Sequence, residues 1–206
     1  MSASVGAIVL CGGQSRRMGQ AKAWLDFGPE KMLQRVVRLA SSVATQVVVV
    51  GAPGQELPDL PTEVLVVRDA VEGRGPLQGL LAGLVALPDS TELAYATATD
   101  VPFLAPAWIA RLRELIGDAD LAIPYTDGFY QPLAALYRRR CVRPAIEGLL
   151  ASDRLRPAFL ADAVKTRVVT VEELRSVDAA LGTLRNLNTP AEYHEALREA
   201  GLAVSP

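Results

Sequence analysis

The sequence is poor in the residues from which most metal and redox sites are built. Its 206 residues include one histidine and two cysteines. Cys11 and Cys141 lie far apart in the chain and cannot form a disulfide framework or a four-ligand zinc site, and a single histidine excludes a histidine-rich site. Any metal that the protein binds is therefore expected to have oxygen ligands.

An excess of positive charge and long apolar runs are also missing. The 21 basic and 23 acidic side chains give a net charge of -2, so the chain lacks the basic excess with which proteins bind nucleic acid. No stretch approaches the roughly 20 apolar residues that span a bilayer, and no charged segment precedes an apolar run at the start, as in a secretion signal. We expect a cytoplasmic protein with no nucleic-acid or membrane partner, whose hydrophobic residues, 50% of the chain, form a core.

What the sequence does contain is an alternation of short apolar runs and amphipathic segments. Strands are expected at 5–10, 46–50, 64–67, 93–99, 120–124, 131–137 and 167–171. Helices are expected at 33–43, 77–87, 106–116, 142–150 and from Pro190, with the helix at 77–87 fully buried. The alternation predicts a Rossmann-like, three-layer α/β domain with a mostly parallel sheet covered on both faces. The runs at 120–124 and 131–137 are too close for a crossover helix, so we expect them to be neighbouring, non-parallel pieces with an edge strand.

The loop after residue 10 has the composition of a phosphate site. It reads LCGGQSRRMG from residue 10 to residue 19 and is followed by Lys22, one of only three lysines in the chain. Glycines let a ligand approach the backbone amides, while Arg16, Arg17 and Lys22 add positive charge. The spacing fits neither the dinucleotide fingerprint nor a P-loop. The alternative is a glycine-rich strand exit with solvated arginines.

Acidic residues follow two other strands. Asp100 comes directly after the strand at 93–99, where its carboxylate can face a ligand, and Mg²⁺ binds one or two carboxylates together with phosphate oxygens. The alternative is an aspartate that bonds the backbone of a turn. Asp69 has a similar position and is either a ligand or an exposed turn residue. The segment 73–79, GRGPLQG, either directs helix amides at an anion or is only a tight turn.

Five motifs together resemble one enzyme family. In chain order they are LCGGQSRRMG (10–19) with Lys22, GPLQG (75–79), DVPFL (100–104), QPLAALY (131–137) and NLNTP (186–190). Each motif occurs across the wider nucleotidyltransferases, whereas all five in this order resemble the molybdenum cofactor guanylyltransferases, the MobA family. The resemblance covers nearly the whole chain. It implies that residues 1–206 form a single nucleotidyltransferase domain of the nucleotide-diphospho-sugar transferase type.

The resemblance also implies roles for particular residues. Those that would bind the guanine nucleotide are Leu10, Cys11, Gly12, Gly13, Lys22, Asp69 and Asp100. Those that would act in catalysis are Lys22, Arg17 and Asp100. Asp100 would hold Mg²⁺. Those that would lie towards the acceptor are Asp127, Asn186 and Asn188.

The reaction of the family joins GMP from GTP to the terminal phosphate of molybdopterin cofactor and releases pyrophosphate. The implied substrates are therefore GTP and molybdopterin cofactor. The implied protein partners are transient ones: proteins that make the cofactor and molybdoenzymes that receive it. Because the attacking phosphate is already an anion, the barrier is charge repulsion rather than proton transfer. The shortage of histidine agrees with that chemistry.

Other functions stay open on the sequence. The pair Gly12 and Gly13 is similar to guanine-using members, whereas related cytidylyltransferases usually carry Ala-Gly, so GTP is favoured over CTP. The chain also has GAPG at 51–54 where the family often has an asparagine-containing segment. The alternatives are a cytidylyltransferase or other NTP transferase, and a non-catalytic nucleotide-binding adaptor that delivers the cofactor. Lys22 and Asp100 argue against the adaptor.

Overall fold

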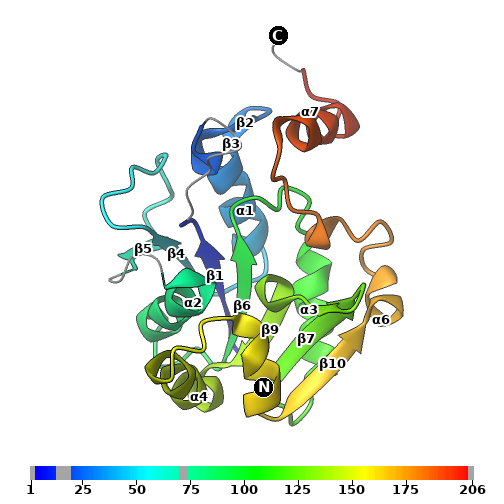
Figure 1. The fold of residues 1–206 in the computed structure, drawn as a ribbon. Coiled ribbons are helices and arrows are strands. Elements are labelled where there is room, and N and C mark those ends of the chain that lie inside the picture. Colours follow the sequence, from blue (N-terminus) through cyan, green and yellow to red (C-terminus); the bar gives the residue numbers. More distant parts are fainter. Residues whose placement is uncertain (1–2, 13–19, 70–73, 204–206) are drawn as a thin grey trace.

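One central sheet organises the molecule. The computed structural model describes residues 3–12, 20–69 and 74–203. Within these residues eight strands form a sheet in the order β10-β7-β9-β6-β1-β4-β5, and β8 pairs with β7 outside this row (Figure 1). The strands of this sheet are β1 (Val5–Leu10), β4 (Gln46–Gly51), β5 (Leu65–Arg68), β6 (Leu93–Ala98), β7 (Leu121–Thr126), β8 (Phe129–Tyr130), β9 (Ala135–Arg138) and β10 (Thr166–Thr170). A separate antiparallel pair consists of β2 (Asp26–Phe27) and β3 (Glu30–Lys31).

The strand directions bring several strand ends to one edge of the sheet. β1 lies between β4 and β6 and is parallel to both, and β5 is parallel to β4. The chain proceeds from β1 outward to β4 and β5 and then places β6 on the other side of β1. Strand order therefore reverses at β1, and ligands of such sheets bind beyond the carboxyl ends at that point. We call the ends of β1, β4, β5 and β6 the carboxyl edge.

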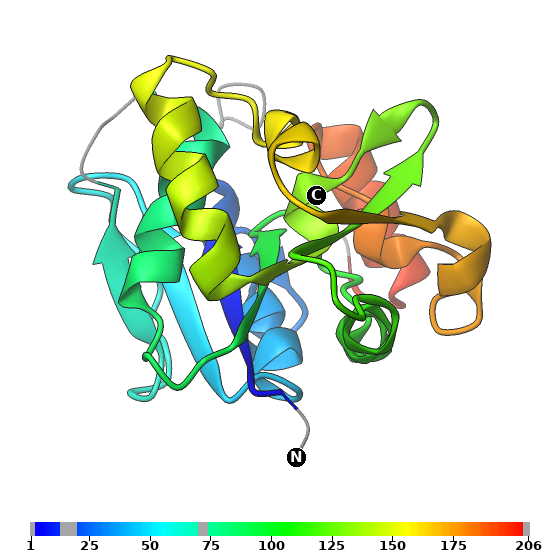
Figure 2. The same cartoon turned by 90° about the horizontal axis from the view of Figure 1, so that it is seen from below.

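Helices cover both faces of the sheet. They are α1 (Met32–Ser41), α2 (Gly75–Ala86), α3 (Pro106–Leu115), α4 (Arg139–Ala151), α5 (Leu160–Ala163), α6 (Val171–Arg175) and α7 (Pro190–Glu199). Along β1, Ala7 and Val9 pack in one core cluster with α1 and α3, whereas Ile8 and Leu10 pack in another with α2 and α4, because successive side chains of a strand point to opposite faces. Figure 2 shows these two helix pairs on opposite sides of the sheet. The expected three-layer α/β domain is confirmed.

The described helices are all too short or too polar to cross a lipid bilayer.

Several details differ from the sequence-based expectation. α2 is not buried all round, since Val85 is 52% exposed on the face that turns away from the sheet. The run at 64–67 becomes β5, an edge strand with Leu65 and Val66 exposed, so this end of the sheet is not covered on both faces. The pieces at 120–124 and 131–137 do pair antiparallel, but only Ala135–Arg138 (β9) of the second piece is a strand, because Pro132–Ala134 form a 3₁₀ helix. β9 also lies inside the sheet, between β6 and β7, rather than at its edge.

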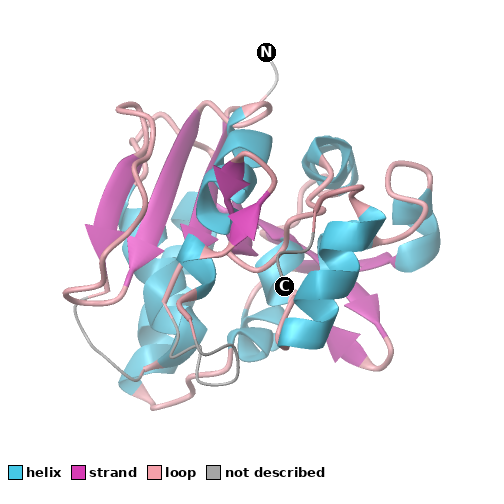
Figure 3. Cartoon of the chain, turned by 90° about the horizontal axis from the view of Figure 1, so that it is seen from above, coloured by secondary structure: helices cyan, strands magenta, loops and turns pink. Residues whose placement is uncertain are grey.

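The last helix packs beside the carboxyl edge. α7 begins with the expected capping box, in which Thr189 Oγ1 accepts a hydrogen bond from Glu192 N at 3.3 Å and the Glu192 carboxylate accepts one from Thr189 N at 2.9 Å. Ala196 and Leu197 of α7 then pack with Phe27 of β2 in a third core cluster. Figure 3 looks down on the side of the molecule where α7 lies. The segment before α7 is thereby brought to the end of β6.

Candidate active site

Three side chains from distant parts of the chain meet at the end of β6. Lys22, which begins a 3₁₀ helix (Lys22–Trp24), places Nζ 2.7 Å from Oδ2 of Asp100. The same ammonium donates a hydrogen bond to Oδ1 of Asn188 at 2.9 Å. Asp100 follows β6 and Asn188 precedes α7. We call this cluster the β6 side of the carboxyl edge.

Backbone hydrogen bonds hold Asn188 in this position. Leu187 N donates to the carbonyl oxygen of Asp100 at 3.0 Å, and Asn188 N donates to Glu192 Oε2 at 2.7 Å. Hydrogen bonds from the backbone of Asn188 and Thr189 lower the pKa of the Glu192 carboxyl below its ordinary range. The start of α7 therefore fixes the backbone of Asn188 close to Asp100.

A second attachment lies a few residues upstream. The carboxylate of Asp178 accepts hydrogen bonds from Gly182 N at 3.0 Å and Thr183 N at 2.8 Å. Thr183 is buried, and its Oγ1 accepts a hydrogen bond from Ala105 N at 3.0 Å. The segment 178–188 is thus attached at two points to the segment 100–105, which begins with Asp100. No pattern in the sequence marks Asp178 and Thr183, because their partners are backbone groups.

Only one of the two carboxylate oxygens of Asp100 has a partner among the described residues. Its side chain is 14% exposed, Oδ2 pairs with Lys22, and Oδ1 is a buried atom that has no hydrogen-bond partner among the described residues. No group of three or more potential ligand side chains occurs in residues 3–12, 20–69 and 74–203. A divalent cation here would have one protein carboxylate and would take its remaining ligands from substrate and water, which is how Mg²⁺ commonly binds. The free oxygen of Asp100 fits such an ion.

The end of β1 is tied to both of its neighbours. Thr99 N donates to the carbonyl oxygen of Leu10 at 3.1 Å, and Cys11 N donates to the carbonyl oxygen of Val50 at 2.8 Å. Cys11 is buried, and this burial is the main reason why the pKa of its thiol is raised. A protonated, buried thiol is a poor nucleophile. Cys11 therefore serves as a small apolar residue, and Gly12 is exposed directly after it.

A different set of residues lies beyond β1, at the ends of β4 and β5. Gln55 Nε2 donates to the carbonyl oxygen of Cys11 at 2.9 Å, and Gln55 Oε1 accepts from Ala52 N at 2.9 Å. Asp69 N donates to the carbonyl oxygen of Gly51 at 2.9 Å. Arg68 extends over Gly51: a Cβ atom on Gly51 would lie 2.2 Å from Nη1 of the arginine. We call Gly51, Gln55, Arg68 and Asp69 the β5 side of the carboxyl edge. The sequence reasoning missed Gln55 and Arg68, although the strand-end position of Arg68 was a usable signal.

Within the described part of the chain, Asp127 and Asn186 make no hydrogen bond or ion pair with the Lys22, Asp100 and Asn188 cluster. Gly13 and Arg17 lie outside the described residues, as does Arg16. Asp127 lies at the exposed tip of the β7–β8 hairpin, where Thr126 Oγ1 donates to its Oδ2 at 3.2 Å. Asn186 is exposed two residues before Asn188.

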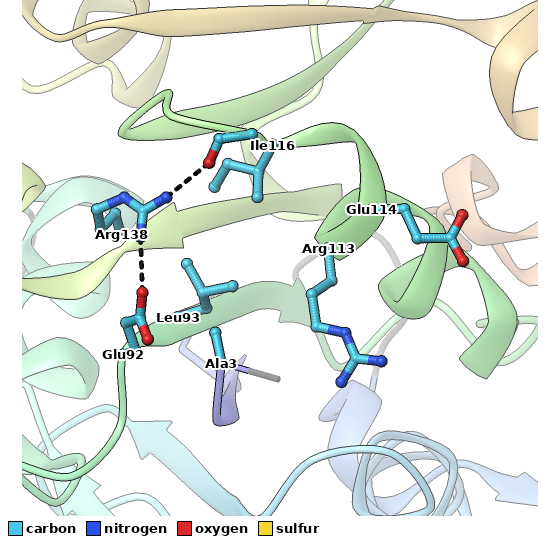
Figure 4. A pocket seen from close by; sticks show the side chains of 8 residues that line it. Ala3, Glu92, Leu93, Arg113, Glu114, Ile116 and Arg138 are labelled. Atoms are coloured by element: carbon cyan, nitrogen blue, oxygen red, sulfur yellow. Dashed lines mark hydrogen bonds and ion pairs between the residues drawn. The ribbon is translucent and has the colours of Figure 1, made fainter. Parts of the chain in front are cut away.

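A surface hollow lies at the opposite end of the sheet, near the start of β6 (Figure 4). Arg138 crosses it, with bonds to Glu92 Oε1 at 2.8 Å and to the carbonyl oxygen of Gly117 at 2.9 Å. These contacts join β6, β9 and the end of α3. Because Arg138 bonds to protein groups, its role in the hollow is to connect these elements. The hollow is separate from the carboxyl edge.

Comparisons with known proteins identify the family of the chain. The family model described as the MobA-like NTP transferase domain matches residues 7–167. A probable molybdenum cofactor guanylyltransferase of Pelotomaculum thermopropionicum is 34% identical over 189 residues, which cover 92% of this chain and 90% of the relative. A protein of the same description from Mycobacterium tuberculosis is 35% identical over 192 residues, 91% and 90% of the two chains.

Solved structures share the fold. The crystal structure of molybdopterin-guanine dinucleotide biosynthesis protein A from Archaeoglobus fulgidus superimposes with a TM-score of 0.79 at 23% identity and covers 95% of this chain and 98% of that one. The 2-C-methyl-D-erythritol 4-phosphate cytidylyltransferase of Thermus thermophilus gives 0.69 at 18% identity, with 98% and 100% covered. The family match, the two relatives and the shared fold lead to one conclusion: the chain belongs to the MobA-like NTP transferases and is a nucleotidyltransferase.

Proposed function

We propose that this protein transfers GMP from GTP to the terminal phosphate of molybdopterin cofactor, with Mg²⁺, and that residues 1–206 form one domain for this task. The names of the curated relatives support this substrate pair. The observation that carries the proposal is the meeting of Lys22, Asp100 and Asn188 at the end of β6. A cation and a carboxylate at the point where strand order reverses suit a nucleoside triphosphate.

The chemistry requires charge neutralisation more than proton transfer. An oxygen of the acceptor phosphate attacks the α-phosphorus of GTP, the bond from that phosphorus to the β-phosphate oxygen breaks, and pyrophosphate leaves. Both reactants are anions, so the main tasks are to hold them together and to offset their repulsion. Lys22 performs this at the phosphates. Mg²⁺ would be held by Asp100, whose Oδ1 has no partner among the described residues, and supplies further charge neutralisation when bound.

The other roles follow from the same arrangement. The backbone from Leu10 to Gly13 receives the nucleotide between the two sides of the carboxyl edge, and Asp69 contacts it. Arg17 assists Lys22. Asn188 orients the ammonium of Lys22, while Asn186 and Asp127 face the acceptor.

Release of pyrophosphate tests the proposal. The purified protein is incubated with each of the four nucleoside triphosphates and Mg²⁺, with and without molybdopterin cofactor. We expect release with GTP only when the acceptor is present. Preference for CTP would contradict the choice of nucleotide, and release that does not need molybdopterin cofactor would contradict the choice of acceptor. Tight binding of GTP without any release would instead support the adaptor function.

A further inference from the structure

One arginine of the carboxyl edge lies away from the Lys22 cluster. Arg68 is the last residue of β5 and pairs in register with Gly51, the last residue of β4. Its guanidinium fills the space in which a side chain of residue 51 would begin, with Nη1 2.2 Å from the position of a Cβ. Any side chain at position 51 would have to displace this group. The guanidinium of Arg68 therefore packs directly over the backbone of Gly51.

The donors of Arg68 are available to a ligand. Within the described part of the chain, no hydrogen bond or ion pair engages its side chain, and the residue is exposed. Its neighbours are fixed: Gln55 by hydrogen bonds to Cys11 and Ala52, and the backbone of Asp69 by one to Gly51. A planar guanidinium has five N–H donors in a rigid fork. The guanidinium of Arg68 therefore lies on a well-defined surface, and its N–H donors are available to a ligand.

The position of the charges indicates which part of a nucleotide reaches this fork. Lys22 and Asp100 lie at the end of β6, on one side of β1, and they suit phosphates. β4 and β5 lie on the other side of β1. A nucleotide with its phosphates against Lys22 that extends across the end of β1 places its base over Gly51 and Arg68.

We propose that Arg68 recognises the guanine base, with two parallel N–H groups donating to O6 and N7. Guanine offers these two acceptors side by side, which is why arginine is its commonest specific partner. Adenine carries an amino donor in place of O6, and cytosine has no such pair of acceptors. This inference rests on the proposed function, because it requires a guanine nucleotide at the carboxyl edge.

Equilibrium binding of GTP, ATP and 7-deaza-GTP, in which a C–H replaces N7, tests this role. We expect Arg68→Met to weaken GTP binding by about ten- to a hundredfold and to leave ATP binding unchanged. The unaltered protein should bind 7-deaza-GTP about fivefold or more below GTP, and Arg68→Met should bind the two equally. Arg68→Lys, which keeps the charge but loses the fork, should resemble Arg68→Met. Arg113→Met is the matched control, because Arg113 lines the distant hollow near the start of β6, and it should change none of these affinities.

A second variant reaches Arg68 indirectly. In Gly51→Ala the new methyl group meets the flexible end of Arg68, so the fold is retained while the guanidinium is displaced. We expect GTP binding to weaken relative to ATP binding, as in Arg68→Met but to a smaller extent. An equal loss for all three nucleotides would mean that Arg68 contacts phosphate and would overturn the inference. If Arg68→Met keeps the preference for GTP, the inference about Arg68 is overturned but the proposed function is not. If the unaltered protein shows no preference for GTP, both are overturned.

Discussion

The two sides of the carboxyl edge handle charge in opposite ways. On the β6 side the ammonium of Lys22 already pairs with Asp100 at 2.7 Å and Asn188 at 2.9 Å, and both charged side chains are largely shielded from solvent. On the β5 side the guanidinium of Arg68 is exposed and is positioned by shape, on a glycine. A substrate must rearrange the contacts of Lys22 on the β6 side, whereas the guanidinium of Arg68 on the β5 side is available without such a rearrangement. The difference suggests a division of work, with phosphate chemistry on the β6 side and recognition of the base on the β5 side.

The change with the largest expected effect is Asp100→Asn. It keeps the shape of the side chain but removes the negative charge that would hold Mg²⁺, so we expect kcat for pyrophosphate release to fall about a hundred- to a thousandfold. Steady-state kinetics with GTP and acceptor measures this. Asp118→Asn, at the amino end of β7, is the control and should leave kcat unchanged. A fully active Asp100→Asn would remove the metal role from this residue.

Lys22→Met tests whether the β6 side treats all nucleotides alike. The ammonium would contact phosphates, which every nucleoside triphosphate carries, so affinity should fall by roughly tenfold for GTP, ATP and CTP equally. Competition binding gives the three ratios. A loss confined to GTP would place the base, rather than the phosphates, beside Lys22 and would reverse the proposed division.

Asp178→Ala tests the attachment that delivers Asn188 to the β6 side. Two backbone N–H groups, of Gly182 and Thr183, lose their acceptor, so the free energy of unfolding should fall by about 1–2 kcal/mol. Thermal unfolding should show this as a decrease of several degrees. Nucleotide preference should not change, because the β5 side is intact. Asp162→Ala, an exposed residue of α5, should unfold like the unaltered protein.

The smallest expected effect concerns acid pH and Glu192. Its pKa is lowered in the folded protein because the backbone N–H groups of Asn188 and Thr189 donate to the ionised carboxylate. Ionised Glu192 therefore stabilises the fold above the ordinary glutamate pKa, and this contribution is lost as pH falls through that range and below it. Glu192→Gln should be slightly less stable than the unaltered protein at pH 7 and indistinguishable from it near pH 3. Glu147→Gln, on the exposed face of α4, should show no difference at either pH.

Much of the β6 side could be predicted from the sequence, because its residues follow strands or begin helices. Lys22 and Asp100 come after β1 and β6, and parallel strands bring their carboxyl ends together. The family resemblance places Asn188 only towards the acceptor, and its contact with Lys22 depends on the packing of α7. The strand-end position of Arg68 is visible in the same way, but its contact with Gly51 is not. Its relation to Gly51 depends on the register between β4 and β5 and on the space above a glycine, and neither is visible in a linear pattern.

The departures of the fold have a similar origin. The apolar run at 64–67 reads like an interior strand, but it forms the last strand on its side of the sheet and therefore stays exposed. β9 enters the sheet between β6 and β7 because the short connection through the β7–β8 hairpin turns the chain back on itself. Sheet order is a property of the whole chain, so local periodicity predicts the strands but not their neighbours.

A crystal structure of the protein with GTP and Mg²⁺ tests the division of the carboxyl edge most directly. The account predicts phosphates against Lys22 and Asp100, with guanine across the end of β1 and its O6 and N7 facing Arg68. Guanine on the β6 side beside Asn188, or phosphates in contact with Arg68, would contradict it.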